Sequence, residues 1–263
     1  MFSRMFGQKT QQAQPSTGGR LVYAVGDIHG RLDAFEPLLQ AIAQDVLISA
    51  PSQRPILILL GDYVDRGPAS AQVVDKILAL RDEPGFEVRT LKGNHEEALL
   101  QFHDEPGFGQ TWVEHGGSAT LASYGVQPPP TRTDPEAWEA ARLAFRQVLP
   151  PAHMDFYQSL ELMITLGDYA FVHAGIRPGV PLDRQSERDL LWIRAEFLQS
   201  TARFEKVIVH GHTPMEEPQV TGRRIGVDTG AYASGILSAV ALEGSGRRVL
   251  SVSSGRNGAQ QLA

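Results

Sequence analysis

Apolar segments that alternate with helical patterns, about every 30 residues, constrain the fold of this chain most strongly. Ile56–Leu60 is a continuous apolar run between Pro55 and Gly61, which is typical of a strand buried on both faces. Similar β-rich runs occur at Leu21–Val25 and near residues 86–91, and apolar residues at helical spacing lie between these runs. This alternation predicts right-handed βαβ units, a parallel sheet and an α/β fold.

Residues 107–151 interrupt the alternation. They contain the turn-rich His115-Gly116-Gly117, a run of prolines and a helical pattern near residues 136–148, so we expect a helical insertion on the sheet. Strands are expected to resume at residues 163–166, 169–173 and 206–209. Short β segments near residues 224–227, 236–242 and 249–252 suggest a second, more antiparallel sheet.

The two ends of the chain differ in composition from its centre. Residues 8–19 are rich in Gln, Ser, Thr and Gly and have almost no large apolar side chain, which is typical of disorder. We therefore predict a disordered leader over residues 1–19, one domain over residues 20–255 and a flexible tail over residues 256–263.

Composition excludes several classes of protein. The chain contains no cysteine, which excludes disulfides, thiolate metal sites and a cysteine-nucleophile phosphatase. The net charge of -6 argues against nucleic acid as a partner. No apolar run approaches the ~20 residues that span a bilayer, and the first residues do not resemble a signal peptide. We predict a soluble cytoplasmic protein that binds neither nucleic acid nor a membrane.

A polar cluster follows each of five expected strands, at the point where the strand ends. These clusters contain Asp27, His29, Asp62, Asn94, His173 and His212. Because the carboxyl ends of strands in an open α/β sheet line one crevice, we expect these side chains to lie together. Carboxylate and imidazole without sulfur suit Mn, Fe, Zn or Mg. So many ligands favour two ions, roughly 3.5–4 Å apart, that share a carboxylate and lower the pKa of a bridging water toward ~7.

The ordered motifs resemble a known family. Asp27-Ile28-His29, Gly61-Asp62-Tyr63-Val64-Asp65-Arg66-Gly67, Gly93-Asn94-His95-Glu96, His173-Ala174-Gly175 and Gly211-His212 are similar to the signature set of the phosphoprotein phosphatase branch of the calcineurin-like metallophosphoesterases. The resemblance covers about residues 21–242 and fits best the bacterial and phage-type serine/threonine phosphatases related to diadenosine tetraphosphatase-like enzymes. It implies an α-β-β-α sandwich of two mixed sheets flanked by helices.

The resemblance also implies a metal-dependent phosphoric ester hydrolase with two divalent ions, for which we expect Mn²⁺ ahead of Fe, Zn or Mg. It implies that Asp27 and His29 hold the first ion and that Asp62 bridges both. The second ion would be held by Asn94, His173 and His212.

The same resemblance assigns the remaining site residues. His95 is similar to the general acid that protonates the leaving oxygen, and Asp65 would orient it. Arg66 and Arg194, together with Asn94, are expected to bind phosphate, since guanidinium matches two phosphate oxygens with paired hydrogen bonds.

The resemblance favours hydrolysis of phosphomonoesters by direct attack of a metal-bridging hydroxide, with phosphoserine, phosphothreonine or phosphotyrosine in proteins as the expected substrates. Similar tetraphosphatases typically carry alanine in place of Asp65 and Asp in place of Glu96. A nucleoside- or dinucleoside-polyphosphate hydrolase with the same metals is the alternative, and a metal-poor binding module is an alternative of another class. The sequence leaves open the substrate, the oligomeric state and any contribution of His115, His210 or Tyr232 to the site.

Overall fold

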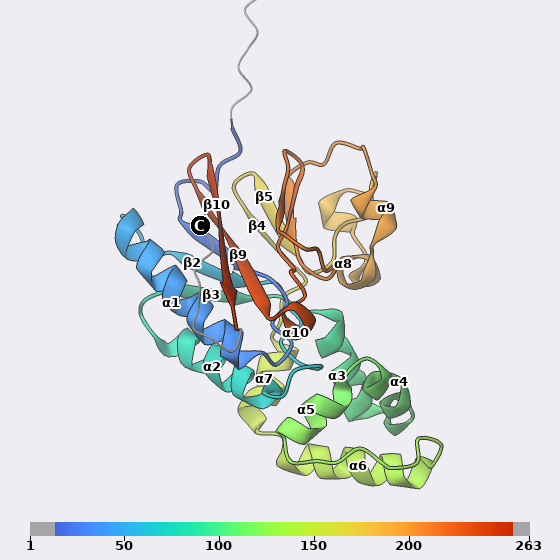
Figure 1. The fold of residues 1–263 in the computed structure, drawn as a ribbon. Coiled ribbons are helices and arrows are strands. Elements are labelled where there is room, and N and C mark those ends of the chain that lie inside the picture. The colour runs from blue at the N-terminus through green and yellow to red at the C-terminus, as the bar shows by residue number, and fades with distance from the viewer. Residues whose placement is uncertain (1–13, 255–263) are drawn as a thin grey trace, which may run out of the picture.

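Two five-stranded sheets packed face to face form the centre of the molecule in the computed structural model, which describes residues 14–254. Helices cover the outer face of each sheet, so the chain forms four layers (Figure 1). Each sheet contains both parallel and antiparallel pairs. The predicted α-β-β-α sandwich of two mixed sheets is therefore confirmed.

The first sheet has the strand order β10-β9-β1-β2-β3. Its members are β1 (Val22–Val25), β2 (Ile56–Leu59), β3 (Glu87–Thr90), β9 (Ile236–Glu243) and β10 (Gly246–Ser253). The strands β1, β2 and β3 are parallel, whereas β9 is antiparallel to both β1 and β10. Both β1 and β2 are buried along their whole length, which explains their continuous apolar sequence.

The second sheet has the strand order β4-β5-β6-β8-β7. Its members are β4 (Met163–Leu166), β5 (Tyr169–Val172), β6 (Val207–His210), β7 (Gln219–Val220) and β8 (Arg224–Gly226). The strands β5, β6 and β8 are parallel, and the edge strands β4 and β7 are antiparallel to their neighbours.

Three apolar layers hold the sandwich together. Between the sheets, Ala24 and Ile58 belong to the same buried cluster as Phe171 and Val209. Outside the first sheet lie α1 (Leu32–Ser49), α2 (Ser70–Asp82) and α7 (Pro151–Gln158). Outside the second sheet lie the short helices η2 (Leu182–Arg184), α8 (Glu187–Trp192) and α9 (Ala195–Leu198).

A group of helices lies beside the first sheet in Figure 1, around the start of α3. Its members are α3 (Asn94–Asp104), η1 (Pro106–Phe108), α4 (Gly109–Glu114), α5 (Gly117–Ser123) and α6 (Pro135–Val148). The rings of Phe102, Trp112, Trp138 and Phe145 pack together as its core. The segment expected as a helical insertion thus shares its core with α3, which carries part of the polar cluster at the end of β3.

The expected grouping of the late strands was wrong. We predicted that residues 236–242 and 249–252 would join residues 224–227 in a second sheet. Instead β9 and β10 complete the first sheet, where Val22 of β1 pairs with Leu242 of β9. Strand β8 pairs with β6 in the second sheet. The short helix α10 (Ala231–Ser234) lies between β8 and β9 in the chain. A strand's pattern reveals its exposure but not its partner, which here lies at the far end of the chain.

The last residues of the predicted leader are packed against the domain. The backbone N–H of Ser16 donates to the carboxylate of Asp168 at 2.9 Å, and Thr17 is buried. Residues 14–19 thus pack against the turn between β4 and β5. Residues 1–13 and the predicted tail at 256–263 lie outside the described residues. Within residues 14–254, no helix combines the length and the apolar character needed to cross a membrane.

Candidate active site

The polar clusters expected at strand ends meet at one edge of the sandwich, and they come from both sheets. Asp27 and His29 follow β1, Asp62 follows β2, Asn94 begins α3, His173 follows β5 and His212 follows β6. All six side chains are buried. The prediction of one crevice in a single sheet is thereby corrected: the carboxyl ends of parallel strands in two facing sheets form the site.

The backbone at this edge is strained. His29, Asp62 and His212 have φ angles of 47°, 52° and 66°, in the left-handed region that non-glycine residues rarely adopt. Asp65 and Arg66, at 72° and 68°, are strained in the same way. Such conformations cost on the order of 1–3 kcal/mol each and persist where surrounding contacts enforce them, often at functional sites.

Backbone carbonyls orient two of the histidines. Nδ1–H of His29 donates to the carbonyl of Val64 at 2.8 Å, and Nδ1–H of His173 donates to that of Leu60 at 2.9 Å. Both Nε2 atoms therefore carry a lone pair that faces the cluster, and each atom lies 3.5 Å from an oxygen of Asp62. Burial lowers the pKa of His29 to about 3 and also lowers that of His173, which keeps both rings neutral, as metal ligands must be.

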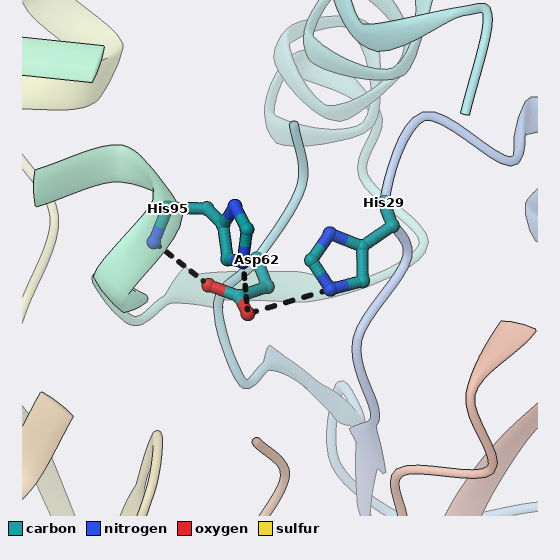
Figure 2. Close-up of side chains that lie close together, drawn as sticks. All are labelled: His29, Asp62 and His95. Atoms are coloured by element: carbon teal, nitrogen blue, oxygen red, sulfur yellow. Dashed lines mark hydrogen bonds and ion pairs between the residues drawn. The ribbon is translucent and has the colours of Figure 1, made fainter. Parts of the chain in front are cut away.

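Asp62 lies at the centre of the cluster. Its carboxylate shares one compact group with His29 and His95, and a second with His173 and His212; the ligand atoms of each group lie within 4.8 Å of one another. Figure 2 shows the first group, in which the neighbouring rings of His29 and His95 both direct Nε2 at Oδ2 of the carboxylate. One carboxylate common to two groups fits two neighbouring ions, and the first group contains His95 in place of the predicted ligand Asp27.

The charge and the free ligand atoms of the site also fit metal ions. Burial, with the charges of Asp228 and Asp62, raises the pKa of Asp27 well above its ordinary range, and burial raises that of Asp228 to about 6. A divalent cation among these crowded carboxylates would offset their charge. Nε2 of His212 is buried and has no hydrogen-bond partner within residues 14–254. A buried polar atom normally has a partner, and a metal ion would be a suitable one for this nitrogen.

His95 and Asp65 form a buried pair beside Asp62. Nδ1–H of His95 donates to Oδ2 of Asp65 at 2.6 Å, which leaves Nε2 of His95 facing Asp62 at 3.9 Å. Burial acts to lower the pKa of His95, but the charge of Asp62 and the hydrogen bond to Asp65 raise it by more. The net effect is a raised pKa of His95.

Arg66 reaches into the same space. Its guanidinium lies 3.1 Å from Nε2 of His29 and 3.2 Å from Nε2 of His95, and it stacks 4.3 Å from the ring centroid of Tyr232. Tyr232 also contacts the ring of His29 edge-on, with centroids 5.3 Å apart. The side chain of Tyr232, whose role the sequence left open, thus lies at the rim of the site.

Arg194 lies farther out than the other predicted residues. Its side chain is exposed and its guanidinium lies 3.5 Å from the hydroxyl of Thr213, next to His212. The neighbouring Trp192 is half exposed, and its ring centroid lies 6.3 Å from that of His212. Both side chains line an open hollow of about 740 Å³ beside the cluster.

The sequence profile of the calcineurin-like phosphoesterases matches residues 21–239, most of the chain. The chain belongs to the calcineurin-like phosphoesterase family. The predicted class of metal-dependent phosphoric ester hydrolase is therefore confirmed, and the histidine and aspartate groups around Asp62 are the kind of metal-binding side chains that such an enzyme needs.

Individual relatives of this phosphoesterase carry different names. The asymmetrical bis(5'-nucleosyl)-tetraphosphatase PrpE of Geobacillus thermodenitrificans is 28% identical over 233 residues, which cover 82% of this chain and 88% of the relative. The crystal structure of a candidate diadenosine tetraphosphatase has a TM-score of 0.61 at 21% identity and covers 94% of this chain and 100% of that chain. A cold-active protein tyrosine phosphatase has a TM-score of 0.55 at 18% identity, covering 89% and 79%. The two structures support the fold.

Sequence reasoning missed several residues that shape the site. Glu96 accepts hydrogen bonds from the backbone N–H groups of four residues around Asp62, and its position three residues after Gly93 is the capping-box spacing that could have revealed it. Asp228 follows β8, so its position at a strand end was a usable signal. Trp112 and Thr120, which bind Asp65, left no local signal.

Two of the open histidines, His115 and His210, belong to neither ligand group around Asp62. His210 is buried, its Nδ1–H donates to the carbonyl of Gly211 at 3.1 Å, and its ring packs edge-on against that of Phe197, with centroids 5.0 Å apart. This contact places His210 against the outer apolar layer of the second sheet, to which Phe197 belongs. His115 has an exposed side chain at the end of α4.

Proposed function

We propose that this phosphoesterase hydrolyses phosphomonoesters. Its main substrates would be phosphoserine and phosphothreonine in proteins, and phosphotyrosine would be an additional substrate. The observation that carries the proposal is the buried Asp65–His95 pair, whose free Nε2 faces the same space as Asp62 and Arg66. A phosphate monoester with an alkyl leaving group needs a proton donor at this place, whereas a good leaving group does not.

The donor set fits two divalent ions, and we propose Mn²⁺. Asp27, His29 and Asp62 would hold one ion. The other would be held by Asp62, Asn94, His173 and His212, where Oδ1 of Asn94 lies 3.0 Å from Nε2 of His173. Bound ions of this kind supply positive charge at the phosphoryl oxygens and make hydroxide available at neutral pH.

The side chains of the chain itself perform the remaining steps. Arg66 binds phosphate oxygens, since its two terminal nitrogens already point at the space between His29 and His95. Arg194, at the rim beside Thr213, is the second phosphate-binding arginine. His95 donates the proton on Nε2 to the leaving oxygen, and Asp65 holds the ring through Nδ1 so that Nε2 keeps its direction.

Hydrolysis of a dinucleoside polyphosphate is the second candidate function. The PrpE relative, which is named a tetraphosphatase, aligns with 82% of this chain. The hollow beside His212 offers the half-exposed ring of Trp192 and the cations of Arg188 and Arg194, and a nucleotide presents a stacking base next to anionic phosphates.

A competition between two substrates tests the assignment. With Mn²⁺ supplied, we expect kcat/KM for a phosphoserine peptide to exceed that for diadenosine tetraphosphate, and Trp192→Ala to change the peptide reaction little. A preference for the tetraphosphate that Trp192→Ala removes would instead establish the second candidate. Metal analysis of the purified protein, followed by reactivation with single metals, tests Mn²⁺.

A further inference from the structure

The helical insertion reaches the candidate proton donor through the segment between Trp112 and Thr120, at the α4–α5 turn. Oδ2 of Asp65 accepts a hydrogen bond from Nε1–H of Trp112 at 2.9 Å, and Oδ1 accepts one from the hydroxyl of Thr120 at 2.6 Å. The backbone N–H of Asp65 donates to the same hydroxyl at 2.8 Å. Asp65, Trp112 and Thr120 are all completely buried, so water cannot replace these contacts.

These contacts fix the plane of the Asp65 carboxylate. Oδ2 is shared by Trp112 and His95, while Thr120 holds Oδ1, so rotation of the carboxylate would break at least two hydrogen bonds at once. A buried carboxylate that loses a donor is left with an unpaired oxygen that water cannot reach, which makes the loss of either donor costly. The direction of the imidazole of His95 therefore depends on two side chains of the insertion.

The same turn supports Arg66. The carbonyl of Gly116 accepts the N–H of Arg66 at 3.2 Å, and a Cβ at Gly116 would lie 2.7 Å from Cγ of Arg66. Gly116 also has a φ angle of 111°, which favours glycine. At Gly117 a Cβ would collide with the ring of Trp112. The glycine pair thus has a stereochemical reason: it brings the turn against Arg66 and leaves room for the indole.

We propose that Trp112 and Thr120 are positioning residues for the proton donor, so that the insertion completes the reaction centre and is not only a cover for the sheet. This inference rests on the proposed role of His95. It predicts that the loss of either hydrogen bond slows those reactions that need protonation of the leaving group.

Two conservative variants and one matched control test the proposal. Trp112→Phe removes the indole N–H but keeps an aromatic ring, and Thr120→Val removes the hydroxyl but keeps the shape. Trp138→Phe is the control, because the buried indole of Trp138 lies in the same insertion and donates to the carbonyl of Arg132 at 2.7 Å, away from Asp65.

We expect Trp112→Phe and Thr120→Val to lower kcat on a phosphoserine peptide about tenfold or more, with little change in KM or metal content. The loss on 4-nitrophenyl phosphate should stay below about threefold, because 4-nitrophenolate leaves with little need of a proton. Trp138→Phe should match the wild type on both substrates. Equal losses on both substrates, or no loss in either variant while both remain folded, would overturn the proposal.

Proton NMR supplies a measurement that does not depend on activity. In protein loaded with diamagnetic Mg²⁺ or Zn²⁺, the Nδ1 proton of His95, hydrogen-bonded to Asp65, should give a far-downfield signal that is absent in Asp65→Asn. We expect this signal to shift or broaden in Trp112→Phe and Thr120→Val and to stay unchanged in Trp138→Phe. An unchanged signal in both variants contradicts the positioning role, whereas a wild type without phosphatase activity but with the expected shifts contradicts only the proposed function.

Discussion

Replacement of Glu96 by glutamine should destabilise the protein strongly, although the two side chains have nearly the same shape. Oε2 of Glu96 accepts from the backbone N–H groups of Asp62 and Gly93, both at 2.9 Å. Oε1 accepts from those of Tyr63 at 2.8 Å and Val64 at 3.3 Å. Glutamine has one oxygen and one NH₂ group, so in either orientation two buried N–H donors would face another donor.

The size of the effect follows from those two donors. A buried donor left without a partner costs about 1–3 kcal/mol, so the pair predicts a loss of about 2–6 kcal/mol in the free energy of unfolding. For a protein of this size that corresponds to a fall in Tm of about 4–24 °C. Because these donors hold Asp62 at a φ angle of 52°, the variant should also bind less metal.

Urea denaturation followed by circular dichroism measures the stability, and Glu97→Gln is the matched control. Glu97 accepts one hydrogen bond, from the indole N–H of Trp192 at 2.7 Å, which a glutamine oxygen can replace. We expect the control to change the free energy of unfolding by less than about 1 kcal/mol. If Glu96→Gln also stays within that limit, the four hydrogen bonds do not have the strength assigned to them and the reasoning is refuted.

Three further variants test the site. Asp62→Asn should abolish turnover and lower the metal content of the protein measured by mass spectrometry, and two metals per chain with near-normal kcat would contradict the shared-carboxylate assignment. His95→Asn should keep its metals and lower kcat by ~10²–10⁴, with the larger loss on a phosphoserine peptide than on 4-nitrophenyl phosphate; equal losses would speak against a proton donor. Gly211→Ala should displace the carboxylate of Asp27, against which its Cβ would collide, so calorimetry should detect weaker metal binding in a folded protein.

The sequence predicted the parts of the site that are local. Each motif lies within a few residues of a strand end, and a buried parallel strand is recognisable from its own apolar run, as Ile56–Leu60 shows. Convergence of Asp27 and Asp62 then follows from the rule that carboxyl ends of parallel strands in one sheet meet at one edge, whereas His173 joins them from the facing sheet.

The tertiary structure alone decided which distant segments meet. The antiparallel pairing of β9 with β1 joins opposite ends of the domain, and no periodicity within either strand specifies it. Trp112 and Thr120 lie 47 and 55 residues from Asp65 in the chain, yet both bind its carboxylate. Short-range patterns record the exposure and conformation of a residue, whereas these contacts depend on the packing of whole helices against the sheet, so only the folded chain contains them.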